Sequence, residues 1–134
     1  LCPGMRERGD GHVINVATWG VKTESPPLFG VYNASKAALS SVSRIIETEW
    51  GDDGVHSTTL YYPLVKTPMI APTRAYDGLP GLSAHEAVGW IVTAARHRPV
   101  SIAPRVAVTA AAVNSVAPAV VDTLMKRQRM QPRS

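Results

Sequence analysis

The sequence predicts an α/β fold in which a helix connects neighbouring strands of a parallel sheet. Three observations support this prediction: an apolar, β-branched run at Gly11–Thr18, a second β-rich run at Val55–Tyr62, and a long stretch of helical periodicity between them. A strand, a helix and a strand in this order form a right-handed parallel crossover. Functional side chains are therefore expected at the carboxyl ends of the strands.

The first run, Gly11–Thr18, is bounded by glycines and is predicted to be a buried parallel strand. A proline-containing loop is expected over residues 19–29. From Gly30 to about Glu49 apolar side chains recur at helical spacing, and the glycines and aspartates of residues 51–54 end the pattern. The second run stops at Pro63, because proline cannot donate to a sheet ladder.

Two shorter elements follow this crossover. Ser83 and Glu86 form a capping box, so a helix is predicted to begin there and to run toward His97. The residues after it, Val100–Ala103, are suited to a short strand.

The last part of the chain is predicted to be helical from Pro104 to about Met125, with Pro118 kinking or dividing the helix. Its most apolar stretch, Val106–Val121, has sixteen residues and falls short of the roughly 20 that a membrane-spanning helix needs. Two interpretations stay open: packing on the core or a partner, and an interfacial helix at a membrane surface. We divide the chain into residues 1–103, the α/β part, and residues 104–134, a helix with a basic tail.

Composition narrows the range of functions. The chain has 134 residues, enough for one domain, and its 45% hydrophobic content is ordinary for a globular protein. The net charge of +4 is concentrated in the tail, where four basic residues lie close together: Lys126, Arg127, Arg129 and Arg133. No aromatic side chain is interleaved with them for base stacking, so we expect no nucleic-acid partner.

The start of the chain and its cysteine content add two expectations. A single cysteine, Cys2, allows no internal disulfide and no pair of metal-binding thiols, which fits a reducing, cytoplasmic compartment. The first residues lack an initiator Met and resemble the last turn of a helix. We therefore expect the chain to be a piece of a longer protein.

Tyr32 and Lys36 carry the clearest chemical signal. They lie one helical turn apart, so the phenol and the ammonium group share one face of the predicted helix. An opposite charge within about 4 to 6 Å favours the ionised form of a phenol, which can then give its proton to an oxygen that gains charge. This is the chemistry of carbonyl reduction. The competing interpretation is a half-buried aromatic ring beside a solvated lysine.

Three motifs in this order resemble the carboxyl-terminal part of the short-chain dehydrogenase/reductase family. They are the strand Gly-His-Val-Ile-Asn-Val-Ala-Thr18, the helix start Tyr32-Asn-Ala-Ser-Lys36, and Pro63-Leu-Val-Lys-Thr67-Pro-Met69 after the next strand. The resemblance implies a Rossmann-like, doubly wound parallel sheet of which the amino-terminal half is missing here. It also implies an NAD(P)-dependent oxidoreductase.

The resemblance assigns the catalytic roles. In the family the Tyr is the general acid, and the Lys binds the nicotinamide ribose and makes the phenol more acidic; Tyr32 and Lys36 match these positions. The family also has a Ser that binds the substrate carbonyl, and Trp19 occupies that position. Thr18 is therefore assigned the role, with Ser25 as a second candidate. The competing interpretation of Thr18 is a strand-end residue that bonds its own backbone.

The segment after the second strand is expected to contact the cofactor. The resemblance maps Pro63, Val65 and Thr67 onto positions that contact nicotinamide. Leu64 replaces the Gly that the family usually has, so the backbone there must avoid a positive φ. The competing interpretation is a loop that is merely punctuated by Pro63 and Pro68.

The cofactor itself is expected to be NADP or NAD, and the resemblance favours NADPH. However, no Gly-rich turn after a strand is present to bind its pyrophosphate, and neither is the residue that would select between the two cofactors. Within the family the sequence looks like the reductase domains of actinobacterial fatty acyl-CoA reductases. That likeness implies a fatty acyl-CoA or long-chain aldehyde substrate, with the segment 70–82 and its side chains Tyr76, Leu79 and Leu82 forming part of an apolar lid. The competing interpretation is a surface loop with scattered apolar side chains.

A second class of function stays open, an inert truncated module that only packs with partner subunits. The predicted helix carries small or apolar side chains suited to such packing: Ala34, Ala37, Ala38, Ser41 and Val42. We expect a homo-oligomer in the complete protein. A membrane-surface contact through the terminal helix and its basic tail is the third interpretation.

Overall fold

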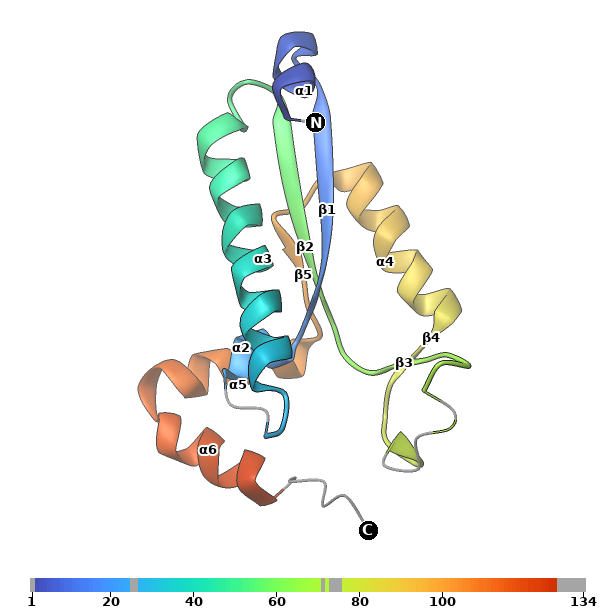
Figure 1. The fold of residues 1–134 in the computed structure, drawn as a ribbon, viewed down its shortest axis with the longest axis vertical. Helices are drawn as coiled ribbons and strands as arrows, with labels where there is room; N and C mark the ends of the chain where they lie inside the picture. Colours follow the sequence, from blue (N-terminus) through green and yellow to red (C-terminus); the bar gives the residue numbers. More distant parts are fainter. Residues whose placement is uncertain (1, 25–26, 71, 73–75, 128–134) are drawn as a thin grey trace.

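The computed structural model describes residues 2–24, 27–70, 72 and 76–127. Its centre is a three-stranded parallel sheet with the order β1 (Gly11–Thr18), β2 (Val55–Tyr62) and β5 (Ser101–Ile102). Helix α3 (Gly30–Trp50) covers one face and α4 (Ala84–His97) covers the other (Figure 1). The predicted α/β class and parallel crossover are therefore confirmed.

Strands β1 and β2 pair along their whole length, from Gly11 opposite Val55 to Thr18 opposite Tyr62. Both strands consequently end at the same edge of the sheet. Strand β5 is much shorter and pairs only beside Thr59 and Leu60 of β2. The first half of β2 therefore has no strand on that side within the described part of the chain.

The two faces of β2 are chemically different. Side chains alternate between the faces of a strand, so Ser57 and Tyr61 point toward α3, whereas Leu60 and Tyr62 point toward α4. The apolar core lies on the α4 side, where Leu60, Tyr62 and Ala94 are buried together and the Tyr62 ring stacks on Trp90 at 5.2 Å between centroids. The α3 side is lined instead by hydroxyl groups.

Strand β1 is less buried than the sequence predicted. Gly11 and Ala17 are buried, but the Val16 side chain keeps 44% of its surface exposed. The cause is position in the sheet, because β1 lies at an edge of the described strands and only β2 pairs with it.

The ends of the main helices follow the predicted signals. Helix α3 ends at Trp50 with Gly51 as its C-cap, and α4 begins with a complete capping box between Ser83 and Glu86. At the turn into β2, Gly54 has φ +79°, and a Cβ placed there would lie 2.1 Å from the Gly9 carbonyl oxygen. Only glycine fits this turn.

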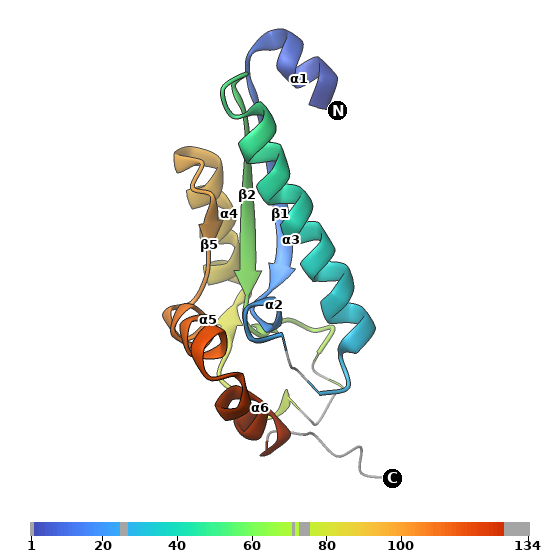
Figure 2. The ribbon, with the colours of Figure 1, turned by 90° about the vertical axis from the view of Figure 1, so that its left-hand side faces the viewer.

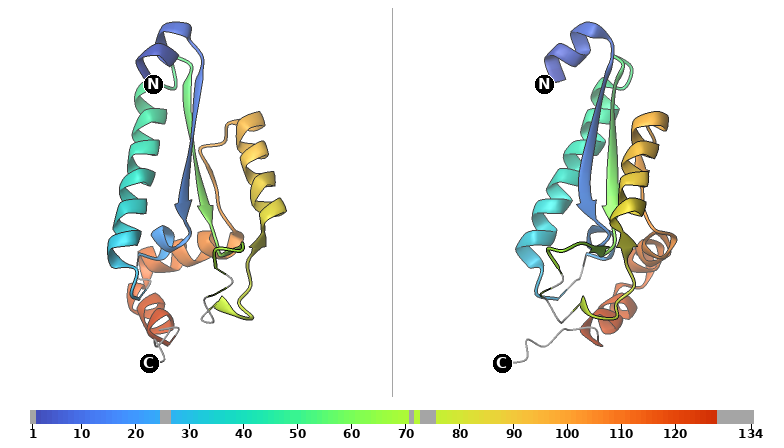
Figure 3. Two further views of the ribbon diagram at one scale, coloured as in Figure 1. Left: turned by 45° about the vertical axis from the view of Figure 1, so that its right-hand side comes forward. Right: turned by 90° about the vertical axis from the view of Figure 1, so that its right-hand side faces the viewer.

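The remaining elements gather around the ends of the sheet (Figure 2). Helix α1 (Cys2–Arg8) precedes β1, and the terminal segment is divided at Pro118 into α5 (Arg105–Val116) and α6 (Pro118–Arg127), as expected. Helices α5 and α6 lie near the edge of the sheet where β1 and β2 end (Figures 1 and 3). No helix in the described ranges is both long and apolar enough to cross a membrane.

Two features replace parts of the expected loops. A four-residue helix, α2 (Gly20–Thr23), follows β1 inside the segment that was predicted to be a loop. After β2, the strands β3 (Val65–Lys66) and β4 (Leu82–Ser83) pair in parallel and form a second, two-stranded sheet.

Candidate active site

The expected site residues come from three segments that meet at the carboxyl edge of the sheet. Thr18 is the last residue of β1, Pro63 follows the last residue of β2, and α3 starts at the same edge (Figure 1). Helix α3 then runs back along the sheet, so its first turns, which hold Tyr32 and Lys36, lie beside the strand ends. The topology thus brings together segments that are distant in the sequence.

Tyr32 and Lys36 lie on the same side of α3. The Lys36 Nζ atom is 5.9 Å from the centroid of the Tyr32 ring and donates a hydrogen bond of 2.9 Å to the carbonyl oxygen of Val16 in β1. The Tyr32 ring is 49% exposed, and Phe29 packs edge-on against it. A half-exposed phenol therefore stands beside an ammonium group that is tied to the sheet.

Thr18 is half-buried at the end of β1. The backbone pairing continues past it, because Trp19 N–H donates to the Tyr62 carbonyl oxygen at 3.0 Å. In the described part of the chain, no hydrogen bond from the Thr18 hydroxyl to its own backbone is formed. The hydroxyl is thus available to another group. Ser25, the second hydroxyl candidate, lies outside the described residues.

The segment after β2 is anchored by its backbone. Val65 lies in β3 opposite Leu82 and packs against the apolar core, and Leu82 N–H donates to the Leu64 carbonyl oxygen at 2.8 Å. Gly81 permits this approach, because a Cβ there would lie 2.5 Å from the same oxygen. Thr67 closes a turn by accepting a hydrogen bond from Ile70 N–H.

Leu64 has no positive φ, which agrees with the expectation for a residue that replaces glycine. The described non-glycine residues with positive φ are Glu24, Leu28 and Arg98.

The expected apolar lid needs a correction. Leu82 belongs to β4 and packs on the core cluster, so it is held in place rather than carried on a loop. Leu79 is 41% exposed, and residues 71 and 73–75 of this segment lie outside the description.

Asn33, which the sequence did not single out, is buried next to Tyr32. Its side chain is only 8% exposed, and its Oδ1 atom has no hydrogen-bond partner within the described residues. It lines a cavity of about 330 Å³ between α2 and α3, together with Val21, Glu24, Gly30, Ala34 and Ala37. No signal in the sequence separates this asparagine from a solvated one.

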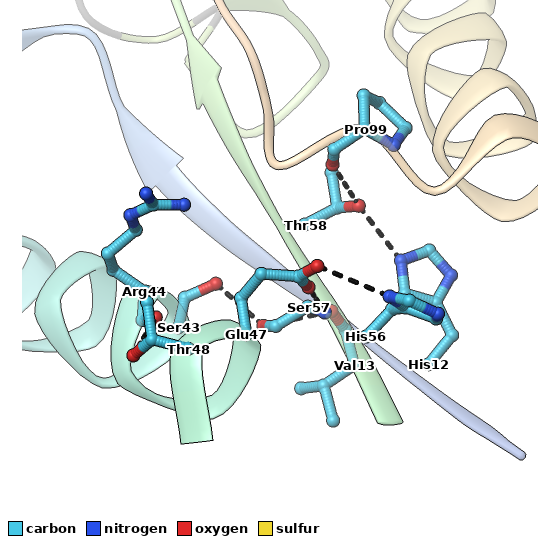
Figure 4. A network of polar contacts seen from close by, with 10 residues as sticks. All are labelled: His12, Val13, Ser43, Arg44, Glu47, Thr48, His56, Ser57, Thr58 and Pro99. Carbon is cyan, nitrogen blue, oxygen red and sulfur yellow. Dashed lines mark hydrogen bonds and ion pairs between the residues drawn. The ribbon is translucent and has the colours of Figure 1, made fainter. Parts of the chain in front are cut away.

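A network of polar contacts lies behind the candidate site, between α3 and the strands (Figure 4). Ser43 and Ser57 are 99% buried and their hydroxyl oxygens are 2.7 Å apart. Glu47 accepts a hydrogen bond of 2.6 Å from Ser57 N–H and lies 3.2 Å from His56 Nδ1. On the other face of β2, the Thr58 hydroxyl donates to the Pro99 carbonyl oxygen at 2.5 Å and lies 2.8 Å from His12 Nε2.

This network changes the acidity of two of its members. Burial alone would raise the pKa of Glu47, but the hydrogen bond from Ser57 N–H and the nearby His56 outweigh it and hold the pKa below its ordinary value. Burial lowers the pKa of His12, and the positive charge of Arg98 lowers it further. Glu47 is therefore a carboxylate at neutral pH, and His12 is a neutral imidazole.

The described residues contain no group of three or more His, Cys, Asp or Glu side chains placed to hold a metal ion. What the arrangement offers is a phenol, an ammonium group and a hydroxyl at one edge of a parallel sheet. Such groups can donate protons and hydrogen bonds to an oxygen that gains negative charge.

Comparison with known proteins adds evidence about ancestry. A family model described as short chain dehydrogenase matches residues 1–77. The chain is 72% identical over 131 residues to a fatty acyl-CoA reductase of Mycobacterium tuberculosis, covering 98% of this chain and 45% of that protein. It is 40% identical over 125 residues to a fatty acyl-CoA reductase of Acinetobacter baylyi, covering 93% of this chain and 42% of that protein. The chain thus spans less than half the length of these two relatives.

Solved structures show the same fold. A short-chain dehydrogenase from Streptomyces avermitilis superposes with a TM-score of 0.70 at 24% identity, over 95% of this chain and 54% of that one. A short chain dehydrogenase from Burkholderia cenocepacia, solved in complex with NADP, has a TM-score of 0.69 at 19% identity, over 96% and 51% of the two chains. At these identities the likeness concerns the fold alone.

Proposed function

This chain belongs to the short-chain dehydrogenase family, and from that premise we propose that it supplies the proton-donating half of an NAD(P)-dependent carbonyl reductase. The observation that carries the proposal is the pair Tyr32 and Lys36, with the ammonium nitrogen 5.9 Å from the phenol ring at the edge where β1 and β2 end. Thr18 ends β1 at the same edge. Each of the three residues has a role in the reaction.

In the proposed reaction Tyr32 donates its phenolic proton to the carbonyl oxygen of the substrate. The hydroxyl of Thr18 donates a hydrogen bond to the same oxygen, and both interactions strengthen as that oxygen becomes an alkoxide. The Lys36 ammonium group stabilises the phenolate that remains. A bound nicotinamide cofactor supplies the hydride for the carbonyl carbon.

The chain holds residues that suit the nicotinamide end of such a cofactor. Lys36 offers hydrogen-bond donors for ribose hydroxyls, and Tyr32 lies beside it with half its surface open. We assign Pro63, Val65 and Thr67 to the nicotinamide side. The chain has no Gly-rich turn for the pyrophosphate, so we infer that residues outside it bind the phosphates. NADPH is the cofactor that we favour over NADH.

We propose a fatty acyl-CoA or a long-chain aldehyde as the substrate. Hydride and proton addition to the aldehyde gives the alcohol directly, whereas the same addition to the acyl-CoA thioester gives a hemithioacetal, which breaks its C–S bond, passes its hydroxyl proton to the sulfur and releases the CoA thiol and the aldehyde. The support comes from two relatives, 72% and 40% identical, that are both named fatty acyl-CoA reductases. The half-exposed phenol at the sheet edge is compatible with a substrate that approaches from solvent.

The direct experiment compares wild-type and Tyr32→Phe forms of the full-length protein. NADPH oxidation is followed with a fatty acyl-CoA and, separately, with a long-chain aldehyde. Loss of a hydrogen-bond donor to a developing oxyanion typically lowers kcat by about 100- to 1,000-fold. Tyr76→Phe is the matched control. Tyr76 belongs to the segment expected to cover the acyl chain of the substrate, and such an apolar contact needs no hydroxyl, so turnover of this variant should be unchanged. Undiminished turnover in Tyr32→Phe would contradict the proposal.

The alternative, an inert module that packs with other subunits, is favoured by one observation. Helix α3 exposes Val31, Val42 and Ile45, which are 90%, 51% and 46% exposed. The same surface supports our proposal that the complete protein is a homo-oligomer. Fluorescence titration of the full-length protein with NADPH separates the alternatives, because a catalytically inert protein that only packs with other subunits is expected not to bind the cofactor. Micromolar binding by this chain alone would contradict our inference that the phosphate site lies elsewhere.

We also propose a membrane-surface contact for the terminal helices. Val116, Val120 and Leu124 are 86%, 51% and 53% exposed across α5 and α6, and basic residues follow them in the sequence. A basic tail next to an apolar stripe suits an anionic lipid surface. Flotation with anionic vesicles at low salt, lost with neutral vesicles, is the expected result.

A further inference from the structure

Helix α3 presents a stripe of polar side chains to the sheet. Lys36, Ser40, Ser43 and Glu47 recur at spacings of four, three and four residues, one helical turn after Tyr32. Each member has a polar partner on a strand: Val16 O for Lys36, Tyr61 OH for Ser40, Ser57 OH for Ser43, and Ser57 N–H with His56 for Glu47. Lys36 belongs to the candidate site, so we keep the name polar stripe for the other three residues, Ser40, Ser43 and Glu47.

The centre of the polar stripe is almost completely buried from solvent. Ser43 and Ser57 each keep 1% of their surface exposed. The Ser57 hydroxyl lies 3.3 Å from the Val13 carbonyl oxygen, to which it donates, so Ser43 must donate to Ser57 across the 2.7 Å between them. This chain of hydroxyl groups joins α3 to β2 and then to β1 (Figure 4).

Glu47 fills a gap in the sheet ladder. Thr59 N–H bonds the Val100 carbonyl oxygen beside β5, and Ser57 N–H, two residues earlier, points to the same edge. Strand β5 pairs only with Thr59 and Leu60 in the described chain. The Glu47 carboxylate therefore takes the place of a strand carbonyl at 2.6 Å, and it also binds His56. The side chain is 18% exposed.

Directionality distinguishes this contact from ordinary helix packing. Apolar packing, as between β2 and α4 around Leu60, depends on area and not on orientation. Hydrogen bonds weaken steeply when their angle changes, and a buried hydroxyl without a partner is costly. The polar stripe therefore admits one axial position of α3 along β2, whereas an apolar contact tolerates small shifts.

We propose that Ser40, Ser43 and Glu47 are positioning residues that fix α3 along β2 and thereby set where the Tyr32 hydroxyl stands relative to Thr18. Thr18 is fixed by the strand pairing, and Tyr32 is carried on α3, so the contact between helix and sheet sets their separation. The inference rests on the proposed carbonyl reduction. It assigns these three residues no contact with substrate or cofactor.

The test uses Ser43→Ala in the full-length protein, with Ser43→Thr as the variant that keeps the hydroxyl. Thr48→Ala is the matched control, since its hydroxyl bonds only backbone oxygens of its own helix, those of Arg44 and Ile45. Small displacements of a catalytic group can cost up to about 100-fold in rate. We expect kcat of Ser43→Ala to fall about tenfold with little change in KM, because binding is retained and proton transfer is slowed.

Two readouts separate positioning from stability. The solvent deuterium isotope effect on kcat should rise in Ser43→Ala and return toward the wild-type value in Ser43→Thr. A variant that merely contains less folded protein would show a lower rate with an unchanged isotope effect. Hydrogen exchange of residues 31–37, measured without substrate, should accelerate in Ser43→Ala and not in Thr48→Ala. The inference is overturned if kcat per folded molecule and the isotope effect stay at wild-type values, or if exchange is unchanged.

Failure of the proposed function gives a different pattern. In that case wild-type protein reduces no acyl-CoA or aldehyde, or Tyr32→Phe remains active. The exchange result for Ser43→Ala is independent of that outcome. Glu47→Ala, which removes the acceptor for Ser57 N–H, serves as a second variant if Ser43→Ala does not fold, and it should give the same acceleration of exchange in residues 31–37.

Discussion

Replacing Lys36 with Met tests how much the ammonium group contributes to the proposed proton transfer. The substitution keeps most of the side-chain volume and removes the charge. Two effects are expected from the structure: the loss of a positive charge 5.9 Å from the Tyr32 ring, and the loss of the hydrogen bond to the Val16 carbonyl oxygen. The two effects differ in what they change, because the first concerns the rate and the second concerns stability.

The size of the first effect follows from Coulomb's law. With the phenolate charge placed at the ring centroid, 5.9 Å from Lys36 Nζ, two unit charges interact by about 0.7 kcal/mol in water and by about 2.8 kcal/mol at an effective dielectric constant of about 20. These energies correspond to rate factors of about 3 and about 100. Because the Tyr32 ring is 49% exposed, solvent screens part of the interaction. We therefore expect Lys36→Met to lower kcat by about 3- to 30-fold.

The assay is steady-state NADPH oxidation by the full-length protein, with the thermal midpoint of each variant measured in parallel. Lys126→Met removes an exposed lysine from α6 and is the matched control. Lys36→Arg keeps the charge and should recover part of the rate. The hydrogen bond to Val16 contributes about 1 kcal/mol or less of stability, so the variant should stay folded. A folded Lys36→Met protein with wild-type kcat would refute the reasoning.

Two further predictions concern stability. Leu60→Ala, in the fully buried centre of the core, should lower the free energy of unfolding by about 3 kcal/mol in urea titration. Val31→Ala, at a side chain that is 90% exposed, should change it by no more than about 0.5 kcal/mol, and equal effects would contradict the packing described. Because burial and then the charge of Arg98 lower the pKa of His12 below 6.5, the unfolded chain takes up a proton first as the pH falls. Stability should therefore be complete above about pH 6.5 and decrease below it, and His12→Gln should flatten that decrease; an identical pH dependence in the variant would count against the assignment.

The long elements could be predicted from the sequence because their signals are local. Apolar periodicity indicated α3, the capping box at Ser83 fixed the start of α4, and Pro118 marked the division between α5 and α6. The pair β3 and β4 could not be predicted, since each strand has two residues and exists only through its distant partner. The exposure of Val16 was missed for a related reason, because burial in a strand depends on which strands pair beside it.

The same distinction applies to the candidate site. Helical spacing predicted that Tyr32 and Lys36 share a face, and the strand-end rule predicted Thr18 at the same edge. Their catalytic roles stay predictions. The hydrogen bond from Lys36 to Val16 and the burial of Asn33 depend on how α3 lies against the strands, so they could not be predicted. The burial of Ser43 and Ser57 could not be predicted either, because the sequence does not indicate whether a serine is buried or exposed to solvent.

The turn at Gly54 has a consequence for engineering this protein. Its backbone touches Gly9, so the connections that lead into β1 and β2 press against each other at the end of the sheet far from Tyr32, and Gly11 N–H is bonded to the Gly54 carbonyl oxygen. Any side chain at this point would force the two strand origins apart. Libraries that aim at new substrates should therefore leave Gly9 and Gly54 unchanged and diversify side chains at the opposite end of the sheet, beside Tyr32.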